Sequence, residues 1–314
     1  MLEIFWRVFT SSDLWAATLQ FAALLLLPAL GGVLSERSGV TNIGLEGMML
    51  MGAFAGVVGA LGTHSVLLGV LIAILAGALI SLIHAVVSIN FKANQVVSGI
   101  AINIAALGLT NYIMFIITGG QGVPSLPNEL RLPEVSLGPL STIPFLGPVL
   151  FQQNIIFYIA LVLLIGIQFL LFNTNVGLRI RAVGEHPQAA DTAGINVPLV
   201  RYLCVLGSGA LAGLAGAFLS LGIAGIFGSN MTAGAGFIAL AAVIFGKYTP
   251  WGAAVACLIF GLGQALGTRL QETHISPNLL NTLPYLLTLI ALVGLVGRTV
   301  APAADGVPYE PGTE

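Results

Sequence analysis

Long apolar stretches, separated by short polar connections, run along almost the entire chain. A helix needs about 20 apolar residues to cross the hydrocarbon core of a bilayer, and turn-forming residues divide the chain into stretches of about that length. The pattern predicts an all-α, polytopic integral membrane protein with about nine spans, within a range of eight to ten. The predicted spans are 14–34, 42–61, 66–89, 95–117, 154–172, 202–222, 233–246, 251–270 and 279–297.

Two of these segments have features of broken or re-entrant helices. The segment 233–246 is short, with Gly234 and Gly236 at one end and Pro250 soon after the other. The segment 42–61 has glycines near its start. Irregular backbone is tolerated at membrane depth only where protein or water surrounds it, so both segments are expected inside the bundle.

Composition supports a membrane location and excludes several functions. Hydrophobic residues make up 57% of the chain and charged residues 7%, and the mean hydropathy is +1.01. A soluble domain normally has about a quarter of its residues charged. The net charge of −2 argues against a nucleic-acid partner. Cys204 and Cys257 lie in apolar runs and are expected to be small buried hydrophobes, so no metal site is predicted.

Basic residues indicate which end of the bundle faces the cytoplasm, because Lys and Arg accumulate in cytoplasmic loops. An N-terminus on the outer side places seven of the ten Lys and Arg inside. This arrangement makes residues 1–314 one transmembrane domain, with an outer loop at 119–153, an inner loop at 173–201 and an inner tail at 299–314. The inner basic residues are Arg37, Lys92, Arg179, Arg181, Arg201, Lys247 and Arg298, and the outer ones Arg7, Arg131 and Arg269.

The two long loops have different compositions. The outer loop is rich in Pro and Gly, which suits a lid, a docking surface or a simple connector. The inner loop reads NTNVGLRIRAVGEHPQAADTAGINVPLVR and holds many of the charged residues. Pro187 can begin a short helix that ends at Gly194 and lies along the membrane surface. Such a helix could insert into a soluble motor domain, or it could be an ordinary interfacial loop.

Polar side chains within the spans are candidates for a solute path, because they are costly there. Glu46 precedes a charge-free interval that extends to Phe91, and Asn42 is expected on the same helical face. The two could bind a ribose hydroxyl or a base edge. The alternative is that Glu46 lies at the inner interface and pairs with Arg37.

Further candidates lie in two other spans. Asn103 and Thr110 fall on nearly one face of the 95–117 span, and Asn111 is displaced by about 80°. Gln264 in the 251–270 span is another candidate, although a lone amide between helices often serves packing. The spacing of Gly52 and Gly56, of Gly209 and Gly213, and of Gly263 and Gly267 predicts close helix contacts.

Four segments of the chain resemble one transporter family. They are GVTNIGLEGMMLMGAFAG at 39–56, NFKANQVVSGIAIN at 90–103, RAVGEHPQAADTAGINV at 181–197 and GFIALAAVIFGKYTPWGA at 236–253. They are similar to the nucleoside and simple-sugar branch of bacterial ABC importer permeases, which are relatives of the ribose and branched-chain amino acid permeases. The tail APAADGVPYEPG at 301–312 also resembles the end of the shorter permease of nucleoside systems.

The resemblance implies a permease like those of type II ABC importers, in a bacterial cytoplasmic (inner) membrane. It implies three protein partners besides membrane lipid: a second related permease in a heterodimer, ABC ATPase subunits below, and an extracytoplasmic substrate-binding lipoprotein. In such permeases the segment similar to GEHPQAADTAGI is the coupling helix to the ATPase. That role is carried over to Gly184, Glu185, Pro187, Ala190, Ala193 and Gly194.

The chain is expected to be a transport subunit and not an enzyme, and to bind no cofactor itself. It contains no G-x-x-x-x-G-K-[ST] motif, so ATP and Mg²⁺ would be used by the partner ATPase. An ion-coupled secondary transporter would need more ionisable residues in mid-membrane. The few fixed charges suit a neutral solute. Nucleosides are the first expectation, followed by simple sugars and branched-chain amino acids.

Overall fold

The computed structural model describes residues 9–120, 125–136, 138–270 and 299–311. Within that part of the chain, seven helices are long and apolar enough to cross a membrane. The predicted span 279–297 lies outside the described residues. The seven are α2 (Ser12–Arg37), α3 (Leu45–Thr63), α4 (Val66–Ala85, continued by η1, Val86–Asn90), α5 (Gln95–Thr118), α6 (Ile155–Asn173), α9 (Val197–Ala217, continued by η5, Phe218–Ala224) and α11 (Pro250–Arg269).

Most of these helices begin within a few residues of the predicted spans, but α9 begins five residues earlier than the predicted start at residue 202. The side chain of Asn196 caps it by accepting a hydrogen bond from the Leu199 amide at 3.0 Å, and Pro198 occupies the first turn. The prediction excluded Arg201 from the span because of its charge. That was wrong, because the Arg201 side chain is buried inside the protein.

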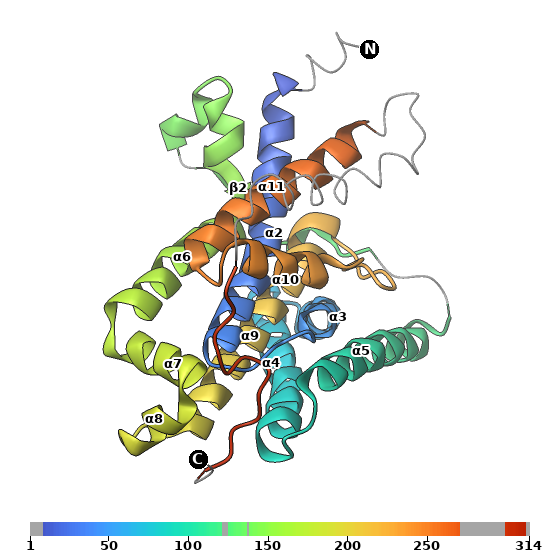
Figure 1. Ribbon diagram of the computed structural model, residues 1–314. Coiled ribbons are helices and arrows are strands. Elements are labelled where there is room, and N and C mark those ends of the chain that lie inside the picture. Colours follow the sequence, from blue (N-terminus) through green and yellow to red (C-terminus); the bar gives the residue numbers. More distant parts are fainter. Residues whose placement is uncertain (1–8, 121–124, 137, 271–298, 312–314) are drawn as a thin grey trace.

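Glycines bring the central helices into close contact. A Cβ on Gly52 of α3 would lie 2.5 Å from the Cα of Gly213 in α9, and one on Gly77 of α4 would lie 2.8 Å from the same atom. Backbones can approach this closely only where side chains are absent. The predicted packing role is therefore confirmed for Gly52 and Gly213. The helices α4, α5 and α6 expose many apolar side chains, α4 on the side that does not pack against α3 and α9. In Figure 1, α5 leans away from the bundle.

The predicted segment 233–246 is a broken crossing. Gly225, just after η5, accepts a hydrogen bond from the amide of Leu126 in the outer loop at 2.8 Å. Irregular backbone then leads to α10 (Ala235–Phe245), whose 11 residues reach only about half the thickness of a bilayer. At its other end, Arg37 Nε donates to the Tyr248 carbonyl at 2.8 Å. By contrast, α3, which corresponds to the predicted segment 42–61, is one continuous helix. The prediction that this segment is broken or re-entrant was wrong.

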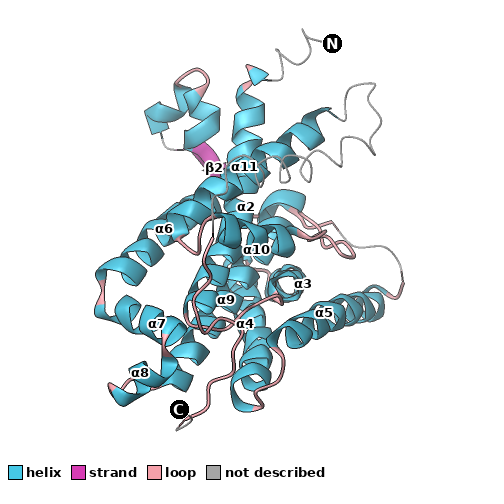
Figure 2. Cartoon of the chain, in the orientation of Figure 1, coloured by secondary structure: helices cyan, strands magenta, loops and turns pink. Residues whose placement is uncertain are grey.

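The outer loop contains the strands of the described chain. Strands β1 (Glu134–Ser136) and β2 (Gln152–Asn154) form one antiparallel pair. Figure 2 labels β2, which is drawn in magenta. Three single turns, η2 (Asn128–Leu130), η3 (Gly138–Thr142) and η4 (Gly147–Phe151), complete the loop. The all-α prediction is confirmed, and this short strand pair is the one addition that the outer loop makes to the described helices.

Candidate functional site

The inner loop contains two helices, α7 (Asn175–Glu185) and α8 (Pro187–Thr192). Thr174 caps α7 by accepting a hydrogen bond from the Gly177 amide at 3.1 Å. Gly177, Ile180 and Val183 form its buried stripe, with the spacing of an amphipathic helix. The sequence prediction missed α7, although the capping threonine and this spacing were readable signals.

The predicted short helix at Pro187 is confirmed as α8. Pro187 lies in its first turn, where no backbone donor is required. Gly194 follows the helix with φ +81°, a left-handed conformation that favours glycine, and its amide donates to the Asp191 carbonyl at 2.8 Å. The helix lies with α7 at the lower end of the molecule (Figure 1).

The six predicted coupling residues divide into an anchored set and an exposed set. Gly184, Pro187 and Ala190 are buried against the chain itself, whereas Glu185, Ala193 and Gly194 are exposed. The first set holds α8 in place, and the second leaves a surface open to another protein. Whether an ATPase binds this surface stays a prediction.

Gly184 anchors the loop by close contact with α2. A Cβ on it would collide with the carbonyl oxygen of Arg37, the last residue of α2. Glu185 lies 3.9 Å from Arg37 Nη1, the distance of a weak ion pair. The end of α2 is thus tied to the residues that immediately precede α8.

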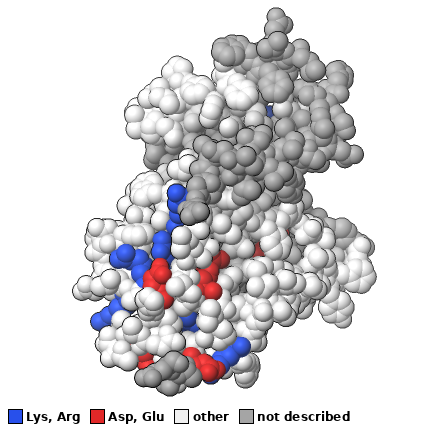
Figure 3. Space-filling model, viewed as in Figure 1, with Lys and Arg blue, Asp and Glu red and all other residues white. Residues whose placement is uncertain are grey.

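A groove of about 740 Å³ lies between α7, the turn after α8 and the start of α9. Its polar side chains are Asn175, Arg179 and Asn196. Most of the acidic and basic side chains visible in Figure 3 gather around this lower end of the molecule. This end of the molecule therefore combines a groove with charged and polar side chains.

Glu46 caps the short helix α10. Its Oε1 accepts hydrogen bonds from Thr232 Oγ1 at 2.6 Å and from the Gly234 amide at 2.8 Å. Its Oε2 accepts one from the Gly236 amide at 2.7 Å. A carboxylate is stabilising at a helix N-terminus, where unpaired amides and the helix dipole are both favourable to it. The predicted alternative of a pair with Arg37 is wrong, because these three donors hold the carboxylate instead.

Asn42 does not share a helical face with Glu46, because α3 begins at Leu45 and Asn42 lies in the turn before it. Its Nδ2 donates to Ser208 Oγ of α9 at 3.0 Å. Its Oδ1 accepts from the Gly44 amide at 3.1 Å. Asn42 therefore fixes the turn against α9 and is fully buried.

Asn103 of α5 holds the start of α3. Its Oδ1 accepts a hydrogen bond from the Gly47 amide at 2.8 Å, and its Nδ2 donates to the Ile43 carbonyl at 3.0 Å. Thr110 Oγ1 donates to the Ala106 carbonyl of its own helix at 2.7 Å. Asn111 and Gln264 are half-buried, and no described residue forms a hydrogen bond with either side-chain amide.

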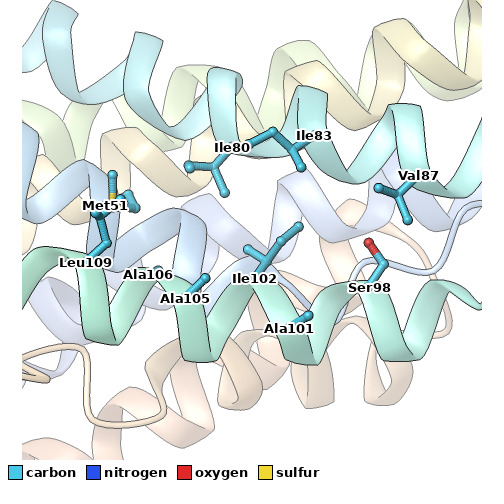
Figure 4. A pocket seen from close by; sticks show the side chains of 10 residues that line it. All are labelled: Met51, Ile80, Ile83, Val87, Ser98, Ala101, Ile102, Ala105, Ala106 and Leu109. Carbon is cyan, nitrogen blue, oxygen red and sulfur yellow. The ribbon is translucent and has the colours of Figure 1, made fainter.

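An apolar groove of about 350 Å³ lies between α3, α4 and α5. Figure 4 shows its side chains pointing into the gap between the helices. Its one polar side chain, Ser98, already bonds with His84 Nδ1 at 2.9 Å, so a ribose would find few hydrogen-bond partners there. The lining residues are Met51, Ile80, Ile83, Val87, Ser98, Ala101, Ile102, Ala105, Ala106 and Leu109.

No group of three His, Cys, Asp or Glu side chains that could hold a metal ion occurs among the residues that the structure describes. What distinguishes the site is a helical bundle with a broken crossing and a polar inner face. Residues 14–292 match the family described as branched-chain amino acid transport system, permease component. The chain belongs to this permease family. It is a multi-pass membrane permease and a transport subunit, not an enzyme.

Three curated relatives are similar over most of the chain. The guanosine ABC transporter permease NupQ of Bacillus subtilis is 47% identical over 93% of this chain and 95% of its own length. The putative glucose ABC transporter permease TsgC13 of Haloferax volcanii is 36% identical over 92% and 93%. The guanosine ABC transporter permease NupP of Bacillus subtilis is 31% identical over 76% and 69%. No solved structure matches the chain.

Proposed function

We propose that this permease is the membrane subunit of an ATP-binding cassette importer and that its solute is a nucleoside. The observation that carries the proposal is the 47% identity with a guanosine permease along almost the whole chain. The scarcity of fixed charges inside the bundle suits a neutral solute. A simple sugar is the second candidate, because a putative glucose permease is also similar, at 36% identity.

The proposed partners follow from the two ends of the molecule. At the inner face, ATPase subunits that use ATP and Mg²⁺ would bind the exposed side of α8. At the outer face, a substrate-binding lipoprotein would deliver the solute. A second, related permease would complete the membrane unit, since NupP and NupQ carry the same functional name in one organism. The exposed apolar faces of α4, α5 and α6 suit lipid or that second permease.

Among the proposed path residues, Asn111 and Gln264 are the strongest candidates for solute contact. Asn42, Glu46 and Asn103 use their polar atoms to hold backbone or another helix. We expect Asn111→Ala and Gln264→Ala to raise the KM of uptake while the complex still assembles. Asn103→Ala should instead lower the amount of folded protein. An unchanged KM in both of the first variants would exclude them from the path.

The substrate is tested by uptake of labelled solutes in cells that express the whole assembly. Guanosine, uridine and adenosine should enter, and unlabelled nucleoside should compete while ribose and glucose should not. The control is the same assembly with an ATPase subunit that cannot hydrolyse ATP, which should show no uptake. Entry of ribose or glucose without nucleosides would establish the sugar alternative.

The ATPase contact is tested by replacing residues 184–190 with a Gly/Ser linker of equal length. Loss of the anchored and exposed residues together should abolish co-purification of the ATPase. The matched control is the same replacement of η3, which is exposed in the outer loop and should leave co-purification unchanged. Retention of the ATPase by the linker variant would refute the coupling role of this segment.

A further inference from the structure

The tail 301–310 lies along the inner face and contacts elements that are far apart in the sequence. Pro302, Ala304 and Tyr309 are buried, although the segment has no regular secondary structure. In Figure 1 its red trace runs down the front of the bundle toward the end where α7 and α8 lie. Unstructured backbone is normally exposed and mobile, so this burial requires specific contacts.

One set of contacts joins the tail to the coupling loop. The Ala304 amide donates to the Gly184 carbonyl at 2.9 Å, and the Ala303 amide donates to Glu185 Oε2 at 3.2 Å. The ring of Tyr309 packs in an apolar cluster with Val183 of α7, Ala190 of α8 and Val197 of α9. Ala190 is one of the two buried residues of α8, with Pro187, so Tyr309 packs against the buried side of that helix.

A second set joins the tail to the turn at 38–44 between α2 and α3. Thr41 Oγ1 donates to Asp305 Oδ1 at 3.0 Å. Arg201 bridges the two segments, since its Nη1 donates to the Val307 carbonyl at 3.1 Å and its Nε to the Ser38 carbonyl at 3.2 Å. The side chain of Arg201 is 1% exposed, and its bond to the Ser38 carbonyl is buried, which strengthens that bond.

The turn at 38–44 leads directly to the broken crossing. Asn42 fixes the turn against α9, and α3 starts three residues later with Glu46, which holds the N-terminus of α10. Movement of the turn would therefore act on α3 and α10 together. At the exposed end of the tail, Glu310 adds an ion pair with Lys92 at 2.9 Å, which is expected to contribute little.

We propose that residues 301–310 form a strap that positions the coupling helix α8 and passes its displacement to the turn at 38–44, with Tyr309 as the main positioning residue. This rests on the proposed ATP-driven function. The tail contacts the segment 184–190, which is the proposed binding site of the ATPase, and the turn at 38–44, which leads into the helical bundle. It therefore connects these two segments in addition to the covalent connection through α9.

The test uses the complete complex reconstituted in liposomes, with nucleoside uptake and ATP hydrolysis measured together. Tyr309→Ala should retain ATPase co-purification and ATP hydrolysis. It should lower the uptake per ATP by about fivefold or more, which corresponds to a loss of roughly 1 kcal/mol of coupling free energy between α8 and the turn. Tyr309→Phe keeps the ring and should restore most of the ratio. Val307→Ala is the control, because its exposed side chain is not used and its carbonyl remains.

A second measurement is independent of the solute and of the stability of any one variant. Hydrogen–deuterium exchange is compared between nucleotide-free and vanadate-trapped complexes. In the parent complex, trapping should change exchange at 184–194 and at 41–48; with Tyr309→Ala or a chain ending at residue 300, it should change only the first segment. Equal responses of both segments without the tail would overturn the proposal. Absence of nucleoside uptake in the parent complex, with both segments responding, would refute only the nucleoside assignment.

Discussion

At the scale of single residues, Glu46 does for α10 what a local N-cap does for an ordinary helix. Its three donors lie 186 to 190 positions away. A buried donor left without an acceptor costs about 1–3 kcal/mol. The carboxylate therefore joins two elements that the chain order separates.

We predict that Glu46→Ala lowers the free energy of unfolding by at least about 2 kcal/mol. Glu46→Gln should have a smaller effect, because its amide keeps one acceptor oxygen. The melting temperature of the detergent-solubilised permease, followed by size-exclusion chromatography after heating, measures the change. The control is Glu129→Ala in the exposed turn η2. Equal melting of Glu46→Ala and the control would show that the cap is not stabilising.

Asp305 makes attachment of the tail dependent on pH. Burial raises the pKa of its carboxyl from 3.8 to about 6, and the Thr41 hydrogen bond and the charge of Arg201 oppose this only in part. Glu36 of α2 is also buried, and its carboxyl interacts electrostatically with that of Asp305. Because the pKa is higher in the attached tail than in a detached one, attachment binds protons. The contribution of Asp305 to tail attachment is therefore largest below about pH 4, and it is lost as the pH rises through about 6.

Limited proteolysis of the tail, or its amide exchange, should therefore be slower at pH 5 than at pH 7.5 after correction for intrinsic rates. Asp305→Asn keeps an acceptor for Thr41 and cannot ionise, so its tail should show no such difference. A pH dependence that persists in Asp305→Asn would assign the effect to another group.

At the scale of elements, the sequence predicted the helices whose boundaries are set by local turn chemistry. The structure places α4 and α5 at Val66 and Gln95, the predicted starting residues, because Ser65 and Asn94 cap them. The predicted start of α9 was wrong because the buried Arg201 donates to the distant carbonyls of Ser38 and Val307. The start of α3 was wrong because Asn42 bonds with Ser208. Long-range partners of this kind are not encoded in a local pattern.

Glycine contacts give a prediction about elements. Gly52→Ala should weaken the packing of α3 on α9 and lower the yield of folded permease strongly, since a Cβ there would meet the backbone of Gly213. Gly108→Ala is the matched control, because no described atom lies within 4 Å of a Cβ at this position of α5, and alanine favours a helix. Fluorescence of a fused reporter after size-exclusion chromatography measures the yield. Equal yields would contradict close packing at Gly52.

At the scale of the whole molecule, the candidate site was only partly predictable. The coupling role of residues 184–194 was predicted from a resemblance to a family and stays a prediction, and the structure adds which of these residues are buried against the chain itself. The tail was known only as a similar sequence. Its contacts with Gly184, Thr41 and Arg201 join four segments, and neither hydropathy nor periodicity contains that information.

The predicted orientation is tested by labelling single cysteines with a membrane-impermeant maleimide. Ser141→Cys in the outer loop should react in intact cells, and Gln188→Cys in α8 only after permeabilisation. The native Cys204 and Cys257 are buried and should give little background. Reaction of Gln188→Cys in intact cells would reverse the assigned sides.

The course of the tail also bears on how the permease is made. Residues 301–310 are synthesised after the turn at 38–44 and after α7, α8 and α9, which are the elements that this tail contacts. The inner face is therefore finished late in biosynthesis, and α8 has no Tyr309 behind it while the chain is still being inserted. A nascent chain halted before residue 301 would present α8 without Tyr309 behind it and without the backbone bonds of the tail to Gly184 and Glu185. We expect such a chain to hold α8 less firmly than the completed permease does.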